Sequence, residues 1–193
     1  YRELSPRLWG AICDLVGGPE RVASEFFADD FVVSLRPFGA RSDPFPGKGD
    51  RAWHVDNASR RARLDAYTNG LVLVALFSDL APASGGTWLA LDSIAKVARL
   101  LADAPEGVDL VERERVAALT LECERFLEVT GEVGDVFLLH PFMLHAGTVN
   151  PSGRIRWMSN PNIELRGPLR LDHRDPSRAS PVERAILAGL PRG

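Results

Sequence analysis

The pattern of hydrophobic and polar positions predicts a series of short β-strands with a helix at each end of the chain. Residues 5–18 carry apolar side chains at helical spacing after Ser5-Pro6 and stop at Gly17-Gly18, which predicts a first helix. Residues 180–190 begin with serine and proline in the same way and predict a closing helix. Six segments between them are rich in β-branched, aromatic or alternating apolar residues, as strands are: 31–38, 70–77, 85–92, 134–140, 142–147 and 154–165.

One stretch departs from this pattern. Residues 93–129 begin with apolar side chains at helical spacing and are interrupted at residues 105–107, so we expect a helical insertion there. Residues 39–50 are rich in glycine and proline and predict an exposed loop. Strands and helices do not alternate regularly. The pattern therefore favours a mainly β fold, a jelly-roll-like barrel with flanking helices, over a parallel sheet.

Composition narrows the class of protein. A chain of 193 residues is expected to form a single domain, 1–193, with a sizeable core. Its net charge of −3 argues against a nucleic-acid partner or a polybasic membrane-binding surface, and no apolar run is long enough to cross a bilayer. The chain begins at Tyr1 without a methionine or a visible signal peptide, so we expect its N-terminus to be incomplete.

Cysteine and basic-residue usage add two points. Cys13 and Cys123 lie far apart without metal-ligand spacing, which suggests two buried thiols in a reducing cytoplasm. Lys48 and Lys96 are the only lysines among 23 basic residues, so the other 21 are arginines. A single arginine is therefore weak evidence for function until its geometry supports it. The glycine-rich nucleotide-binding motifs are absent.

The first candidate chemistry lies in His54-Val55-Asp56. Residues i and i+2 of a strand face the same side, so His54 and Asp56 can converge on one metal ion while Val55 packs behind them. The alternative is a hydrogen-bonded polar pair at the end of a strand. The pair alone does not decide between the two.

A third ligand would come from the remaining histidines. His173 lies in a charged segment and is expected to be solvated, and His140 is expected to have a structural role. His145 is the better candidate because a turn-forming segment, 149–153, follows it. If the chain reverses there as a hairpin, Arg156 stands opposite His145.

Two details of this reversal stay open. Arg154 has the same parity as Arg156 but would lie nearer the turn. The two flanking strands can also belong to different sheets, which would keep both residues near one opening without pairing them. In either arrangement a guanidinium near the site suits a carboxylate ligand. Two imidazoles, one carboxylate and open positions are typical of non-haem Fe(II) oxygenases.

With these residues the chain resembles the phytanoyl-CoA dioxygenase-like family of Fe(II)/2-oxoglutarate-dependent oxygenases. The resemblance runs from about residue 4 to residue 190, and four stretches carry it: WHVD (53–56), SGGTWLALDS (84–93), GDVFLLHPFMLHAG (134–147) and NPSGRIRW (150–157). It implies a double-stranded β-helix core, Fe(II) held by His54, Asp56 and His145, and Arg156 binding the distal carboxylate of 2-oxoglutarate. It also suggests that Thr87 touches the cosubstrate, although a threonine that only fills the sheet is an equal alternative.

The chain departs from the family at several positions. Val55 stands where many relatives have glutamine, Gly147 replaces a serine that often binds 2-oxoglutarate, and the sequence LDSI (91–94) replaces a P-G-S-H motif. Whether Thr148 substitutes for that serine is open. Related halogenases lack the aspartate, so Asp56 argues against halogenation.

The resemblance implies a dioxygenase that hydroxylates, or otherwise oxidises, an unactivated C–H bond of a small-molecule substrate. The reaction requires Fe(II), consumes 2-oxoglutarate and O2, and releases succinate and CO2. Desaturation and ring closure use the same chemistry, and neither the substrate nor the oligomeric state follows from the sequence. The alternative is a non-catalytic, metal- or ligand-binding cupin-type domain.

Overall fold

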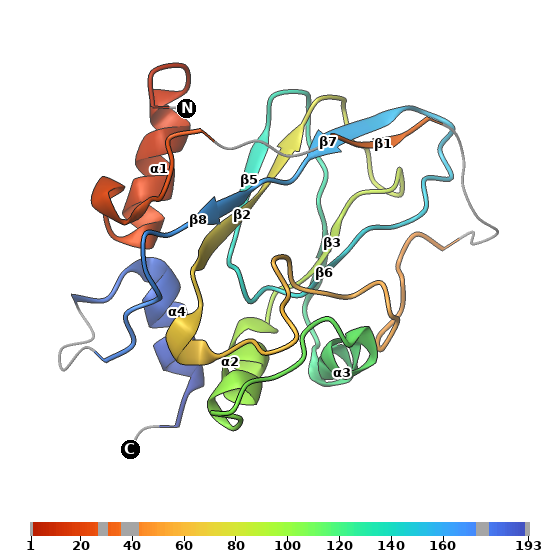
Figure 1. Ribbon diagram of the computed structural model, residues 1–193. Coiled ribbons are helices and arrows are strands. Elements are labelled where there is room, and N and C mark those ends of the chain that lie inside the picture. The colour runs from red at the N-terminus through yellow and green to blue at the C-terminus, as the bar shows by residue number, and fades with distance from the viewer. Residues whose placement is uncertain (1, 27–30, 36–42, 173–177, 192–193) are drawn as a thin grey trace.

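The structure is a computed structural model that describes residues 2–26, 31–35, 43–172 and 178–191. Two antiparallel sheets form the centre of this part of the chain, with helices around them (Figure 1). The larger sheet has the order β1 (Phe31–Ser34), β7 (Arg156–Ser159), β2 (Asn69–Leu76), β5 (Val136–Leu139), and β8 (Asn162–Glu164) also pairs with β2. The smaller sheet has the order β4 (Phe126–Glu128), β3 (Trp88–Ala90), β6 (His145–Ala146).

The strand pairings are nested along the chain. β1 pairs with β7, a single bridge joins His54 to His145 of β6, β2 pairs with β5, and β3 pairs with β4. Each pair encloses the next one in sequence, and successive pairs alternate between the larger and the smaller sheet. The chain is thus one long hairpin whose two arms pair along their length. This arrangement makes neighbours of residues as distant in sequence as His54 and His145.

β2 is the central strand, and it is buried on both faces. Val72, Val74 and Leu76 point into the core between the two sheets, where Leu89 and Met158 also lie. The alternate residues Leu71 and Leu73 belong to a second core under the helices, which includes Ile12 and Val16 of α1. The sequence prediction of a strand with two apolar faces in 70–77 is confirmed.

Helices cover one end and one side of the sheets. In Figure 1, α1 (Pro6–Val16) and α4 (Pro181–Gly189) lie beyond the β8 end of the larger sheet, and α2 (Ile94–Ala102) and α3 (Arg113–Ala118) lie below. α1 ends at Gly17, whose φ of 93° favours glycine. α4 begins with a capping box between Ser180 and Glu183. Three short 3-10 helices complete the set: η1 (Pro19–Arg21), η2 (Leu64–Ala66) and η3 (Leu119–Glu122).

No helix in the described part of the chain has the length and apolar character needed to span a membrane.

The β-rich core with flanking helices agrees with the sequence prediction, and three finer expectations do not. The described strands form two separate antiparallel sheets and not a closed barrel. The helical insertion ends earlier than residue 129, because β4 (Phe126–Glu128) pairs with β3. The hairpin between His145 and Arg156 is wrong: β6 pairs with β3, whereas β7 pairs with β1 and β2. The alternative arrangement is confirmed: the strands on either side of the turn, β6 and β7, belong to different sheets.

Candidate metal centre

Two histidines face each other across the bridge that closes the smaller sheet. The backbone N–H of each residue donates to the carbonyl oxygen of the other, His54 to His145 and back, at 3.0 Å in both directions. Their imidazole rings consequently lie 4.4 Å apart between centroids. Trp53 and Val55 on either side of His54 are almost fully buried and hold this segment against the core.

Asp56 turns back toward the two rings. It is followed by Asn57, whose φ of 56° lies in the left-handed region that asparagine tolerates, so the chain bends sharply after Asp56. Oδ1 of Asp56 lies 3.5 Å from Nε2 of His54 and 3.4 Å from Nε2 of His145. One ligand atom from each of the three residues lies within 4.8 Å of the others. The structure therefore brings these three residues together, as the sequence predicts. His54, however, lies in an isolated bridge and not in a regular strand.

The other ring nitrogen of each histidine is engaged by the backbone. Nδ1 of His54 lies 2.7 Å from the carbonyl oxygen of Ala52, and Nδ1 of His145 lies 3.1 Å from that of Met143. A carbonyl oxygen only accepts, so Nδ1 carries the proton in both rings. Nε2 is left with its lone pair directed at Asp56. This arrangement of imidazoles is common in metal sites.

The polar atoms at this point fit a cation. Nε2 of His145 and Oδ2 of Asp56 are buried and have no hydrogen-bond partner among the described residues. Ligand atoms about 2.1 Å from one ion lie about 3 Å apart when their bonds are perpendicular, close to the distances observed here. Burial alone would raise the pKa of the Asp56 carboxyl, but when the imidazoles of His145 and His54 carry a proton on Nε2, their hydrogen bonds and charge outweigh burial and hold that pKa below its usual range. The carboxylate is thus charged and available as a ligand.

A cavity of about 200 Å³ opens beside the two histidines. Its wall combines polar side chains with apolar ones from the larger sheet: Val32, His54, Val74, Thr87, His145, Gly147, Arg156, Met158 and Asn160. Gly147 and Arg156 also line a wider hollow of about 540 Å³ on the outer side, so the cavity has a neighbouring space from which a ligand can enter.

Arg156 reaches this cavity from β7. Its Nη1 donates to the carbonyl oxygens of Gly85 and Thr148, the latter at 3.2 Å. Its Nε is buried and unpaired, and no described acidic side chain forms an ion pair with it. Burial lowers the pKa of the guanidinium from its ordinary value. Arg154 is exposed, so the preference for Arg156 over Arg154 agrees with the geometry.

Two threonines named from the sequence take different positions. Thr87 is buried and lines the cavity, and the only acceptor near its hydroxyl in the described structure is Sδ of Met158, at 4.0 Å. The hydroxyl of Thr148 donates to the carbonyl oxygen of Gly86 at 3.0 Å and lines the outer hollow, not the cavity. Its hydroxyl is thus engaged by the backbone, outside the cavity that the two histidines line.

His140 is structural, as expected. Its Nδ1 accepts from the backbone N–H of Phe142 at 3.0 Å, and its Nε2 donates to the carbonyl oxygen of Val182 at 3.1 Å. Both ring nitrogens are thus used within the fold. His173 lies outside the described residues.

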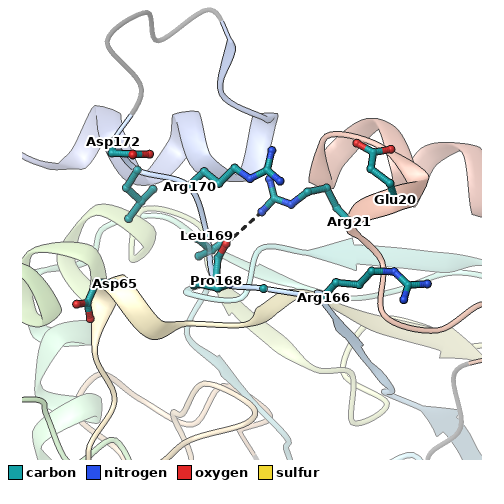
Figure 2. Close-up of a pocket in the computed structure, with 10 residues that line it drawn as sticks. Glu20, Arg21, Asp65, Arg166, Pro168, Leu169, Arg170 and Asp172 are labelled. Carbon is teal, nitrogen blue, oxygen red and sulfur yellow. Dashed lines mark hydrogen bonds between the residues drawn. The ribbon is translucent and has the colours of Figure 1, made fainter.

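A larger hollow lies elsewhere in the described structure. It measures about 630 Å³, and Figure 2 shows the charged side chains around it, which come from 20–21, 65 and 166–172. None of the three candidate metal ligands lines it. Arg21 donates there to the carbonyl oxygen of Pro168 at 3.4 Å (Figure 2). It also pairs with buried Glu183 at 3.0 Å, so its charge is balanced within the fold.

Comparison with known proteins found no match to this chain, either among protein-family models or among curated proteins. The interpretation of the site therefore depends on its own geometry. That geometry includes one polar residue that the sequence did not single out, Asn160, which lines the cavity. Its signal was available: Asn160 continues the alternation of Arg156 and Met158 at i+2 and i+4.

Proposed function

We propose that this chain is a non-haem Fe(II)/2-oxoglutarate-dependent dioxygenase of the phytanoyl-CoA dioxygenase-like type. The observation that carries the proposal is a combination of features at one cavity. Two histidines and an aspartate converge from segments far apart in the sequence, and a partly buried arginine without a described acidic partner lies in the wall of the cavity beside them. A metal site and a carboxylate site side by side are what this reaction requires.

The strand pairings support the matching fold. Eight consecutive pairing segments, counting the His54 bridge as one, pair first with last and so on inward, and the pairs alternate between two sheets. This winding is the pattern of a double-stranded β-helix, which we propose as the architecture of the core. The candidate ligands would then lie between its two sheets, on the second and seventh segments.

Each residue has a definite task in this proposal. His54, His145 and Asp56 would hold Fe(II), and the carbonyl oxygens of Ala52 and Met143 keep both Nε2 lone pairs directed at it. Arg156, oriented by the carbonyl oxygens of Gly85 and Thr148, would bind the distal carboxylate of 2-oxoglutarate. Val32, Val74 and Met158 would limit access of water.

Bound Fe(II) supplies the redox chemistry by which O2 and 2-oxoglutarate oxidise a C–H bond, with release of succinate and CO2. The protein contributes ligand geometry, orientation of the cosubstrate and a largely apolar wall. The substrate is proposed to be a small molecule that enters from the outer hollow beside Gly147 and Arg156.

The test is anaerobic addition of Fe(II) and 2-oxoglutarate to the purified chain. We expect a weak visible charge-transfer band, which requires the metal and the 2-oxo acid to be bound together. His145→Ala should abolish the band, whereas Arg154→Ala, which changes an exposed residue outside the cavity, should leave it unchanged. A wild-type chain that shows no band would contradict the proposal and leave the non-catalytic binding domain as the better interpretation. Succinate release against a panel of small molecules would then identify the substrate class.

A further inference from the structure

Asn160 stands at the far end of the cavity wall from Arg156. It directly follows β7, and Pro161 after it favours an extended backbone, so the alternation of the strand continues and places Asn160 on the face of Arg156 and Met158. Four residues of extended chain span about 13 Å. Asn160 and Arg156 thus lie at opposite ends of one row of side chains along the cavity.

The side-chain amide of Asn160 makes no hydrogen bond within the described structure. The residue itself is partly exposed. Its neighbours in the cavity wall include the apolar side chains of Val32, Val74 and Met158, which offer it no strong partner. A side-chain amide offers two donors and one acceptor, and at Asn160 these groups are not used by the described fold and are open to a ligand in the cavity. The position favours a role in holding a ligand.

The cavity is small enough to limit which ligand that is. Its volume of about 200 Å³ corresponds to roughly seven water molecules, so a dicarboxylic acid would fill it and reach both ends. Arg156 would take one carboxylate. Of the remaining polar side chains, Thr148 donates to the backbone and Gly147 has no side chain to offer, which leaves Thr87 and Asn160 for the other end.

We propose that Asn160 donates a hydrogen bond to the metal-bound carboxylate of the 2-oxo acid and so sets the orientation of the chelate. This inference depends on the proposed function, because it assigns a residue to the same ligand. Asn160, which directly follows β7, would supply part of the hydrogen bonding that Gly147 does not provide.

The experiment measures 2-oxoglutarate binding by the full chain loaded with Fe(II) without oxygen, using the visible band. Asn160→Leu keeps the approximate volume and removes the donor, and the dissociation constant should rise about tenfold or more. Asn160→Asp places a negative charge beside the carboxylate and should raise the dissociation constant further. Trp157→Phe, which changes an exposed side chain of β7 outside the cavity, is the control and should change the dissociation constant less than about twofold. Mn(II) affinity, read by electron paramagnetic resonance without the acid, should be unchanged in all three variants.

The outcomes separate this inference from the proposed function. If the wild type shows the band but Asn160→Leu binds 2-oxoglutarate as well as Trp157→Phe does, Asn160 has no such role and the proposed function stands. If Asn160→Leu weakens Mn(II) binding by the same factor as it weakens 2-oxoglutarate binding, the residue supports the fold and the inference is overturned. A wild type without the band overturns both.

Discussion

At the scale of single residues, the decisive feature is a cationic side chain held in place by neutral partners. Arg156 is fixed by two carbonyl oxygens, from Gly85 and Thr148, and neither neutralises its charge. A partly buried guanidinium in this setting favours an anion within the cavity. The role of Arg156 can therefore be separated from that of the metal ligands.

We expect Arg156→Ala to weaken 2-oxoglutarate binding by about 10- to 100-fold, because charge-assisted hydrogen bonds to a carboxylate are lost. Mn(II) affinity should change by less than about twofold, since the guanidinium is not a ligand. Isothermal titration of each ligand measures both values. Arg154→Ala, an exposed arginine two residues earlier, is the control. Equal weakening by the two variants would show that general charge, and not position, attracts the acid.

The residues of the candidate site could be predicted where their chemistry is local. The i and i+2 spacing of His54 and Asp56 is visible in the sequence, and the turn after His145 follows from Asn150, whose side chain bonds Ser152 and Arg154. Asn160 shares the strand alternation of Arg156 and Met158, but it was missed because nothing in its own neighbourhood indicates how far a cavity extends along that strand. Its exposure to that cavity depends on strands that come from the other arm of the hairpin.

At the scale of elements, a buried ion pair connects the N-terminal segment to the last helix. Arg21 of η1 donates to Glu183 of α4 at 3.0 Å, and both side chains are almost completely buried. Glu183 also accepts from the backbone N–H groups of Arg170 and Ser180. Burial would raise the pKa of the Glu183 carboxyl, but these hydrogen bonds and Arg21 outweigh it and lower that pKa.

Glu183→Gln should lower the free energy of unfolding by about 3 kcal/mol, because it leaves the buried guanidinium of Arg21 without a countercharge. Urea unfolding near neutral pH measures the effect. Glu106→Gln is the matched control: Glu106 lies 3.5 Å from Arg61 on the surface, and its loss should change stability by less than about 0.5 kcal/mol. Equal effects of the two substitutions would show that the buried pair adds no more than a surface pair.

The elements themselves were predictable where one pattern covers a whole segment. β2 and α1 follow from apolar periodicity, and α4 from its capping residues. β4 was not predictable, since its three residues follow a helical stretch and become a strand only by pairing with β3. β6 lies within the predicted strand 142–147, but only its two residues pair with β3, so the strand is shorter than predicted. Short strands depend on their partners more than on their own sequence.

At the scale of the whole molecule, the nested pairing explains why the site is built as it is. The arms of the long hairpin meet at His54 and His145, so a metal bound there would tie together two segments far apart in sequence. The same arrangement makes the region between His140 and His145 important for stability. His140 connects the end of β5 to α4 through the carbonyl oxygen of Val182.

This connection requires a neutral imidazole, because Nδ1 of His140 accepts from the backbone N–H of Phe142. Burial lowers the pKa of His140 to about 4, whereas an unfolded chain has a histidine pKa of about 6.5. Between these values the unfolded state binds more protons than the folded state, so the free energy of unfolding falls as pH decreases. The loss from pH 6.5 to pH 4 is on the order of 3 kcal/mol.

The measurement is the free energy of unfolding in urea at several pH values between 4 and 7, for the wild type and for His140→Gln. The variant is expected to be less stable at pH 7 and to lose less stability on acidification, since it has no group at this position that takes up a proton on unfolding. Carboxylates whose pKa also differs between the folded and unfolded states, such as Glu183, are common to both proteins and cancel in the difference. Two curves that run parallel over this range would show that His140 does not couple protonation to the folding of the molecule.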